Sequence, residues 1–235
     1  MNISRKIHNL LHPKIGEIWM LHRVVEHRSE KPEQRVLEVT PEWLEQKILE
    51  YQRKGYSFIS IDDIPKLSTF HFPLSTFICI TLDDGYRDNY TLAFPLFKRM
   101  GIPFVVYVTT GFIDSQCEMW WYPGEQLGIG TEELKRMTAE PLCTIGAHTV
   151  SHPKLATIPS KIQRHEIEQS KMQLESLLGT PITHFSFPHG SYNSDTLEIC
   201  RSLGFKTAVT TNGRTVRTDY DPLQLDRINI VQNDE

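Results

Sequence analysis

Two adjacent carboxylates, Asp83 and Asp84, end a strongly apolar run in the sequence TLDDG (81–85). Such a run predicts a buried strand, which would deliver both side chains to its carboxyl edge. Neighbouring acids repel each other, so burying the pair is costly unless a cation or hydrogen bonds compensate. One interpretation places one carboxylate on a metal and leaves the other free as a base. The other is an Asp-Asp-Gly turn that caps the next helix.

Two histidines, His148 and His152, follow a second apolar run. Pro153 disfavours the helical conformation at His152, so the pair is predicted in a loop at a strand end rather than on a helix face. This is the same edge on which Asp84 would lie. Two histidines and one carboxylate with open positions form a common catalytic metal site.

A third short apolar run leads into the turn Pro188-His189-Gly190. Gly190 has no Cβ and would let the backbone approach a ligand closely. As a turn alone it is unremarkable, so its meaning depends on the other two motifs.

The elements that must position these side chains follow from the hydrophobic pattern. Short runs rich in Ile, Val, Phe and Thr alternate with amphipathic stretches, which predict strands and helices respectively. The predicted strands are Glu17–Val24, Phe77–Leu82, Phe104–Thr109, Thr144–Ala147, His184–Phe187, Thr207–Thr210 and Leu225–Val231. The predicted helices are Pro41–Lys54, Asn89–Met100, Ser160–Leu178 and Ser194–Leu203. This alternation predicts an α/β fold with a parallel sheet, either doubly wound or a barrel.

The connection 111–130 is long and carries the adjacent residues Trp120 and Trp121. In α/β folds, long loops that follow strands build the active-site face. The two indoles could form a wall for a sugar or a hydrophobic ligand, and they could equally cap the core.

The composition is that of an ordinary globular chain, with 235 residues, 39% of them hydrophobic and 23% charged. The net charge of −4 excludes a general nucleic-acid binder, which would carry a basic excess. The four cysteines are scattered without a CxxC pair, which argues against a disulfide scaffold and a Cys-type zinc site. No stretch is apolar enough to span a membrane, and the N-terminus lacks a signal-peptide pattern, so we expect a cytoplasmic protein.

Three motifs in this order resemble those of carbohydrate esterase family four, the polysaccharide deacetylases of the nodulation-deacetylase homology type: TLDDG (81–85), HTVSHP (148–153) and FPHG (187–190). The resemblance extends from about Ile18 to Val231. It implies a distorted (β/α) barrel of seven or eight strands in one domain, with the site at the carboxyl ends of the strands. We therefore divide the chain into an N-terminal extension, residues 1–16, and a deacetylase-like catalytic domain, residues 17–235.

The resemblance also implies a role for each matching residue. The metal ligands would be Asp84, His148 and His152. The family most often uses zinc, so we expect one divalent ion, Zn²⁺, which would activate a water and polarise the amide carbonyl while Asp83, as general base, accepts the proton. The backbone N–H of His189, beside Gly190, matches the position that helps to hold the oxyanion.

The chain departs from the family pattern at two positions. Many members carry an Arg that orients the base where this chain has Ser186; Arg227 is the candidate substitute, with a surface salt bridge as the alternative. The usual C-terminal Leu-x-x-His motif is absent, since no histidine follows His189. A subgroup that resembles the poly-N-acetylglucosamine deacetylases places this histidine on the first strand. We therefore expect His22 to be the general acid, with His189 as the second candidate.

Other functions remain open at this point. Fe(II) oxygenases also use two histidines and one carboxylate, but the jelly-roll members place the acid two residues from the first histidine and lack intervening helices. A metal-bound sugar-binding protein without turnover is open if His22 is misassigned. A hydrolase of another small C–N amide substrate is open as well.

The sequence thus predicts a metal-dependent hydrolase that removes an N-acetyl group from an amino sugar, with Trp120 and Trp121 as sugar contacts. Inside a cell it would act on a glycan or a glycan precursor in surface polysaccharide biosynthesis. The substrate would be an N-acetylated sugar, a nucleotide sugar or a lipid-linked glycan at the inner membrane face. Peripheral association with a membrane is compatible with this prediction.

Overall fold

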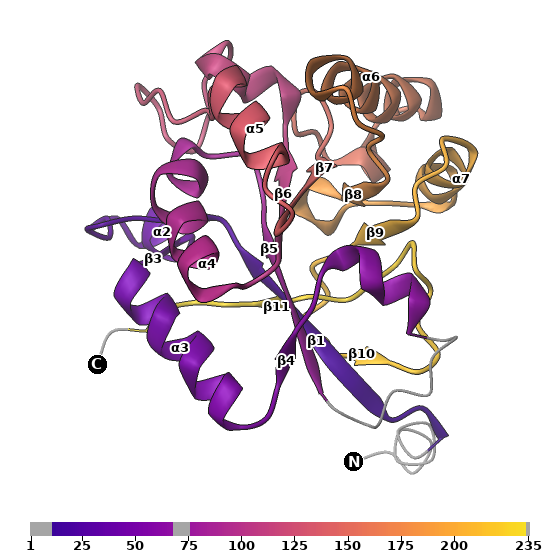
Figure 1. The fold of residues 1–235 in the computed structure, drawn as a ribbon. Coiled ribbons are helices and arrows are strands. Elements are labelled where there is room, and N and C mark those ends of the chain that lie inside the picture. The colour runs from indigo at the N-terminus through magenta and orange to yellow at the C-terminus, as the bar shows by residue number, and fades with distance from the viewer. Residues whose placement is uncertain (1–10, 68–75, 234–235) are drawn as a thin grey trace.

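The structure is a computed structural model that describes residues 11–67 and 76–233. Within these residues, seven strands form a curled sheet in the order β10-β1-β5-β6-β7-β8-β9 (Figure 1). Their bounds are β1 Lys14–Leu21, β5 Phe77–Leu82, β6 Phe104–Val108, β7 Cys143–Ala147, β8 His184–Ser186, β9 Thr207–Val209 and β10 Val216–Arg217. Neighbours run parallel, except that β10 pairs antiparallel with β1. The predicted α/β fold with a distorted, single-domain barrel is confirmed.

Four further strands are short, and two of them join the same sheet, which then has nine strands. Strand β4, Ser57–Phe58, pairs with β5, and β11, Ile228–Asn229, pairs with β1. Strands β2, Arg23–Val24, and β3, Glu38–Val39, form a separate two-stranded sheet. The first strand of the barrel begins at Lys14, three residues before the predicted start of the catalytic domain, while residues 1–10 of the predicted extension lie outside the described residues.

The helices pack around the outside of the curled sheet (Figure 1). Their bounds are α2 Pro32–Arg35, α3 Pro41–Arg53, α4 Phe94–Met100, α5 Thr131–Thr138, α6 Ser160–Leu178 and α7 Ser194–Ser202. Helix α3 begins after Thr40, whose Oγ1 accepts a hydrogen bond from the backbone N–H of Trp43 at 3.3 Å. Helices α4 and α6 end at Gly101 and Gly179, which adopt φ of 67° and 68°. None of the described helices is both long and apolar enough to cross a membrane.

The helix predictions differ from the structure at three elements, one of which is α2, a four-residue helix that was not predicted. The first turn of the predicted helix Asn89–Met100 is a π-helix, Asn89–Ala93, which runs directly into α4. Helix α5 is absent from the prediction because it buries only Leu134 and Met137, a pattern too short to detect as periodicity.

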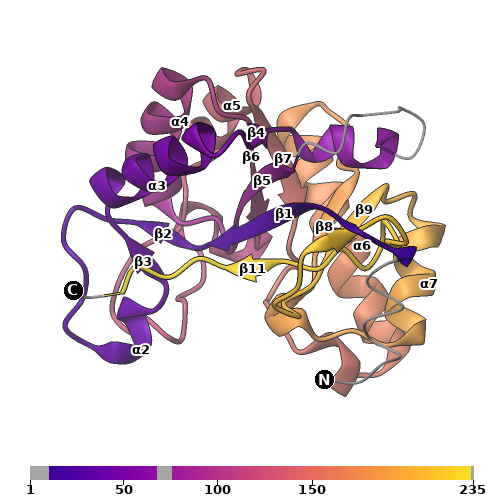
Figure 2. The ribbon, with the colours of Figure 1, turned by 90° about the horizontal axis from the view of Figure 1, so that it is seen from below.

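The segment 225–229 closes the seam between the two ends of the sheet. Leu225 bridges to Val209 of β9, and three residues later β11 pairs with β1. Figure 2 shows β1 and β11 side by side. The predicted strand Leu225–Val231 is therefore only partly correct. Its ladder is interrupted at Arg227, because the segment changes its pairing partner there.

Alternate residues along the strands face two different cores. One set packs inside the barrel and includes Ile18, Cys79, Val105 and Tyr107. The other set packs under the helices and includes Trp19, Ile80, Val106 and, from the helices, Leu44 and Ile167. Because both faces of the strands are buried, polar side chains gather where the strands end.

Candidate active site

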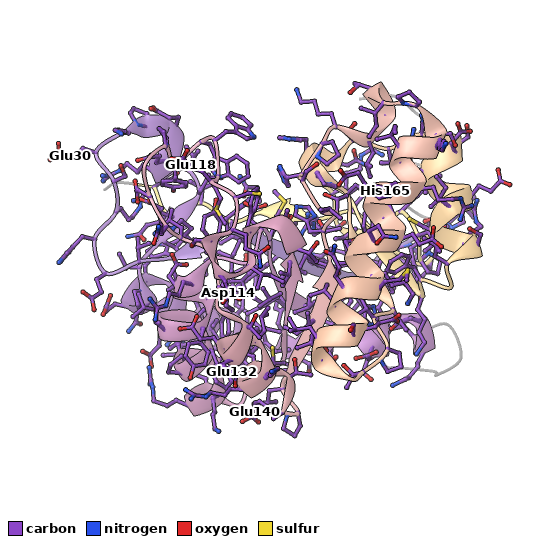
Figure 3. The ribbon with its side chains drawn as sticks, turned by 90° about the horizontal axis from the view of Figure 1, so that it is seen from above. Glu30, Asp114, Glu118, Glu132, Glu140 and His165 are labelled. Atoms are coloured by element: carbon purple, nitrogen blue, oxygen red, sulfur yellow. The ribbon has the colours of Figure 1, made fainter. Side chains whose placement is uncertain are left out.

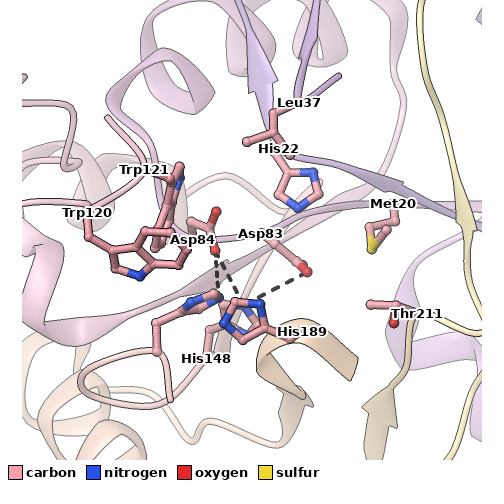
Figure 4. Close-up of a pocket in the computed structure, with 11 residues that line it drawn as sticks. Met20, His22, Leu37, Asp83, Asp84, Trp120, Trp121, His148, His189 and Thr211 are labelled. Carbon is pink, nitrogen blue, oxygen red and sulfur yellow. Dashed lines mark ion pairs between the residues drawn. The ribbon is translucent and has the colours of Figure 1, made fainter. Parts of the chain in front are cut away.

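A cavity of about 250 Å³ opens at the carboxyl ends of the barrel strands (Figure 4). It is lined by Met20, His22, Leu37, Asp83, Asp84, Trp120, Trp121, His148, His152, His189 and Thr211. Strands β1, β5 and β7 end directly before His22, Asp83 and His148. Parallel strands present their carboxyl ends at one edge, so residues far apart in sequence meet there.

The three predicted metal ligands come together at this edge. The Nε2 atoms of His148 and His152 lie 3.4 Å and 3.3 Å from the same oxygen, Oδ1 of Asp84. One donor atom from each of the three residues lies within 4.8 Å of the others, as a shared metal ion requires. Two imidazole nitrogens and one carboxylate oxygen suit zinc and similar divalent ions and leave positions open for water or substrate.

The two imidazoles are oriented in different ways. His148 Nδ1 lies 2.8 Å from the carbonyl oxygen of Ser186, which holds the proton on Nδ1 and leaves Nε2 free to bind a cation. The ring of His152 packs between Trp121 and His189, with ring centroids 5.0 Å and 4.5 Å away. Aromatic packing therefore takes the place of a hydrogen bond at His152.

The electrostatics favour a cation next to Asp84. Burial raises the pKa of this carboxyl, but His148 and His152 outweigh burial and hold the pKa well below its usual value. Burial lowers the pKa of His152 to about 3, so its imidazole stays neutral, as a metal ligand must be. Burial also acts to lower the pKa of His148, but Asp83 and Asp84 outweigh it and raise the pKa. These shifts favour an ionised carboxylate between the two imidazoles.

The backbone at the site is strained. Asp84, Thr149, His152 and His189 adopt left-handed φ values of 74°, 67°, 61° and 57°. Each such conformation costs free energy in a residue that is not glycine and persists only where the surroundings enforce it. Strain of this kind concentrates at functional sites, which agrees with the position of these four residues.

Arg227 pairs with Asp83 from inside the barrel. Its Nη1 and Nη2 donate to Oδ1 and Oδ2 of Asp83, both at 2.7 Å. Arg227 is fully buried, so the alternative of a surface salt bridge is wrong. Burial raises the pKa of Asp83, but Arg227 outweighs burial and lowers it, which keeps the carboxylate ionised.

The small side chain of Ser186 completes this arrangement. Its Oγ donates to Asp83 Oδ2 at 3.2 Å and accepts from Arg227 Nη2 at 3.0 Å. Arg227 thus reaches the base from the seam segment, and Ser186 leaves it the room to do so.

His22 faces the acid pair from the opposite wall of the cavity (Figure 4). Its carbonyl oxygen accepts a hydrogen bond from Asn89 Nδ2 at 2.8 Å. Asp88 accepts from the backbone N–H of Val24 at 3.2 Å and from Arg23 Nε at 2.7 Å. The helical turn after the acid motif therefore fixes the backbone from the carbonyl of His22 to Val24.

The tryptophans form another wall. Trp120 is 68% exposed at the rim, whereas Trp121 is partly buried and donates from Nε1 to Tyr86 Oη at 2.5 Å. The expectation that both line a ligand cavity agrees with their positions, and only Trp121 also packs against the interior. Gly190 has φ of 64°, and a Cβ there would lie 2.1 Å from Thr211 Oγ1, so this close approach requires glycine.

Three lining residues were not predicted as site residues: Met20, Leu37 and Thr211. Thr211 follows β9 as a polar residue at the same edge, a signal that the sequence does contain. Leu37 lies at the end of the segment that connects β2 to β3, and no local sequence pattern indicates that this segment reaches the cavity.

The chain is thus a curled α/β barrel whose carboxyl edge carries two adjacent acids and two histidines that can hold a metal ion. Within the chain, residues 74–208 match the model of the family described as polysaccharide deacetylase. This match covers more than half of the sequence, and the chain belongs to the polysaccharide deacetylase family. Both His22 and Arg227 lie outside the matched residues.

Individual relatives agree with this assignment. The Bacillus subtilis (strain 168) protein YxkH, whose name assigns it to the polysaccharide deacetylases, is 27% identical over 158 residues, 67% of this chain and 53% of that protein. This chain therefore spans about half the length of that relative. The Streptococcus pyogenes deacetylase PplD, solved in complex with acetate, is 26% identical with a TM-score of 0.78, over 92% of both chains.

A further solved structure supports the fold. IcaB from Ammonifex degensii has a TM-score of 0.81 and 23% identity, over 93% of this chain and 92% of that one. At this identity the similarity concerns the fold alone.

Proposed function

We propose that this protein is a metal-dependent hydrolase that removes the acetyl group from an N-acetylated amino sugar. One observation carries the proposal: a carboxylate paired with a buried arginine lies directly beside a cluster of one carboxylate and two imidazoles. The first carboxylate is kept ionised and can accept a proton, while the second group can hold a cation. Membership of the polysaccharide deacetylase family supports the reaction class.

The proposed metal ligands are Asp84, His148 and His152. A divalent cation bound there, which we propose to be Zn²⁺, would lower the pKa of a water molecule and polarise the amide carbonyl. Asp83 accepts the proton of the attacking water, because Arg227 holds it ionised and oriented. Its Oδ2 lies 4.0 Å from Nε2 of His148, so the base is adjacent to the cation site.

The remaining residues act on the leaving group and the carbonyl oxygen. His22, on the opposite wall, donates a proton to the departing amine, and His189 is the alternative donor. The backbone N–H of His189, which the Gly190 turn brings to the cavity, stabilises the developing oxyanion. The acetyl group leaves as acetate and the sugar keeps a free amine.

Trp120 and Trp121 would bind the faces of the sugar ring, whose C–H groups pack against aromatic rings. The proposed substrates are a nucleotide sugar, a lipid-linked glycan or another glycan precursor for surface polysaccharide biosynthesis. We place this reaction in the cytoplasm, with peripheral contact to the membrane when the carrier is a lipid.

Acetate release from a panel of N-acetylated sugars, running from nucleotide-linked monosaccharides to chito-oligosaccharides, tests the proposal. The protein is analysed for bound metal, and Asp83→Asn is assayed as its control. Release by the wild-type protein alone is the expected result. Bound metal without any release from the panel would contradict it and favour another amide substrate or a binding role.

A further inference from the structure

The loop that connects the two metal-ligand histidines has no regular secondary structure of its own to hold it. Residues 148–152 follow β7 as irregular backbone with a bend at residues 150 and 151, and Thr149 and His152 both adopt left-handed φ values, 67° and 61°. Such a backbone relaxes unless hydrogen bonds outside the loop oppose relaxation. The distance between the two imidazoles depends on this conformation.

Glu166 of helix α6 supplies such bonds. Its Oε2 accepts from the backbone N–H groups of Val150 and Ser151, both at 2.9 Å, and its Oε1 accepts from Ser151 Oγ at 2.7 Å. Figure 3 labels the preceding residue of α6, His165. Glu166 is only 9% exposed, so these charge-assisted bonds act with little competition from water.

The carbonyl side of the same loop is held by another segment. The backbone N–H groups of Thr110 and Gly111 donate to the carbonyl oxygens of Thr149 and Val150, at 3.1 Å and 2.9 Å. The backbone N–H groups of the loop thus bond to α6, and its carbonyl oxygens bond to the segment after β6. The β6 side holds the loop mainly through backbone N–H groups, together with Thr109 Oγ1, which donates to the carbonyl oxygen of His148 at 3.0 Å. The α6 side is one carboxylate, which a single substitution can remove.

We propose that Glu166 is a positioning residue for the metal centre. Its carboxylate fixes the Val150–Ser151 backbone and thereby sets the spacing of His148 and His152 before a cation arrives. This proposal rests on the proposed function, because it requires that the two imidazoles bind a metal. Glu166 belongs neither to the three ligand residues nor to the cavity lining, so it would act on metal affinity through the loop backbone.

The test is the dissociation constant for Zn²⁺, measured by competition with a chromophoric chelator in wild type, Glu166→Gln and Glu166→Ala. Alanine removes all three hydrogen bonds, and we expect binding weaker by about 10- to 100-fold. Glutamine keeps an acceptor for the loop N–H groups and should recover part of this loss. The matched control is Glu168→Ala, which removes the same charge from the same helix and should bind Zn²⁺ like wild type.

Thermal unfolding of the metal-free proteins separates positioning from simple destabilisation. A lower melting temperature with unchanged Zn²⁺ affinity in Glu166→Ala would overturn the proposal, and so would an equal loss of affinity in Glu168→Ala. If Glu166→Ala does not fold, Ser151→Ala removes one of the three bonds and should weaken binding roughly three- to tenfold. Wild-type protein that binds no Zn²⁺ would instead overturn the metal centre and this role with it.

Discussion

Replacing Arg227 with methionine keeps a long side chain but removes the cation that faces Asp83. The wild-type guanidinium donates to both oxygens of Asp83 at 2.7 Å, to Thr81 Oγ1 at 2.9 Å, to Ser186 Oγ at 3.0 Å and to the carbonyl oxygen of Thr210 at 2.8 Å. Arg227 and Asp83 are 0% and 3% exposed, so water cannot replace these bonds without opening the barrel.

The expected loss of folding free energy in Arg227→Met follows from this burial. Removing one partner of a buried ion pair leaves an uncompensated charge and costs about 3–5 kcal/mol of folding free energy. For a chain of this size, such a loss lowers the melting temperature by roughly 6–20 °C. The base would also lose its orientation, so turnover should fall together with stability.

The pH dependence has a definite sign. In the wild type Arg227 lowers the pKa of Asp83, so this stabilisation is present above the unfolded pKa of about 3.9 and is lost as pH falls through the lowered folded value. In Arg227→Met burial, the largest influence on this carboxyl, is opposed only by the weaker effects of His148 and His22, so we expect the folded pKa to rise above the unfolded one. The ionised carboxylate then lowers the free energy of unfolding as pH rises through that value. The difference in melting temperature between the variant and the wild type should therefore become smaller as pH is lowered.

The assay is thermal unfolding of metal-free protein across a pH series, with Arg99→Met as the control. Arg99 also makes a bidentate pair, with Glu45 at 2.7 Å and 2.9 Å, but its side chain is 61% exposed. The control should therefore melt close to wild type. Equal melting temperatures for the two variants, or a deficit independent of pH, would refute the reasoning.

Three further predictions concern catalysis and binding. His22→Ala should lower kcat by about 10²–10⁴ with unchanged metal content, and wild-type turnover would assign the acid role to another group such as His189. Trp120→Ala should raise KM about three- to tenfold without changing the melting temperature, since this indole is 68% exposed; an unchanged KM would remove Trp120 from the sugar site. Chelation should abolish acetate release. Zn²⁺ at about 100 times its dissociation constant should stabilise the metal-free protein by about 2.7 kcal/mol, and equal melting temperatures with and without Zn²⁺ would contradict the proposed metal site.

Much of the site could be predicted because strand ends share an edge. The apolar runs before Asp83, His148 and His189 are read directly from the sequence, and a parallel sheet brings their ends together. The acid pair Asp62–Asp63 shows that two acids after an apolar run do not by themselves predict a place in the site. It also follows an apolar run, yet Asp62 Oδ1 lies 2.9 Å from Nε2 of His184, the first residue of β8 and thus at the opposite edge of the sheet.

The supporting residues could not be predicted in the same way. Glu166 and Asn89 act through backbone groups of loops that are distant in sequence, so neither residue type nor spacing indicates the contact. Arg227 was a candidate only through the family resemblance, because its pairing with Asp83 depends on the seam, where a strand changes its neighbour. These contacts arise from tertiary closure, which hydrophobic periodicity does not encode.

The most direct test of the central claim combines metal titration with turnover. Zn²⁺ is added in steps to metal-free wild type and to Asp83→Asn, and bound metal and acetate release are measured at each step with a substrate found in the sugar panel. Hydrolysis at one centre predicts that wild-type activity rises with bound metal and saturates at about one ion per chain. Asp83→Asn should bind the ion and release no acetate. Full wild-type activity before any metal is bound, or an active Asp83→Asn protein, would contradict the account.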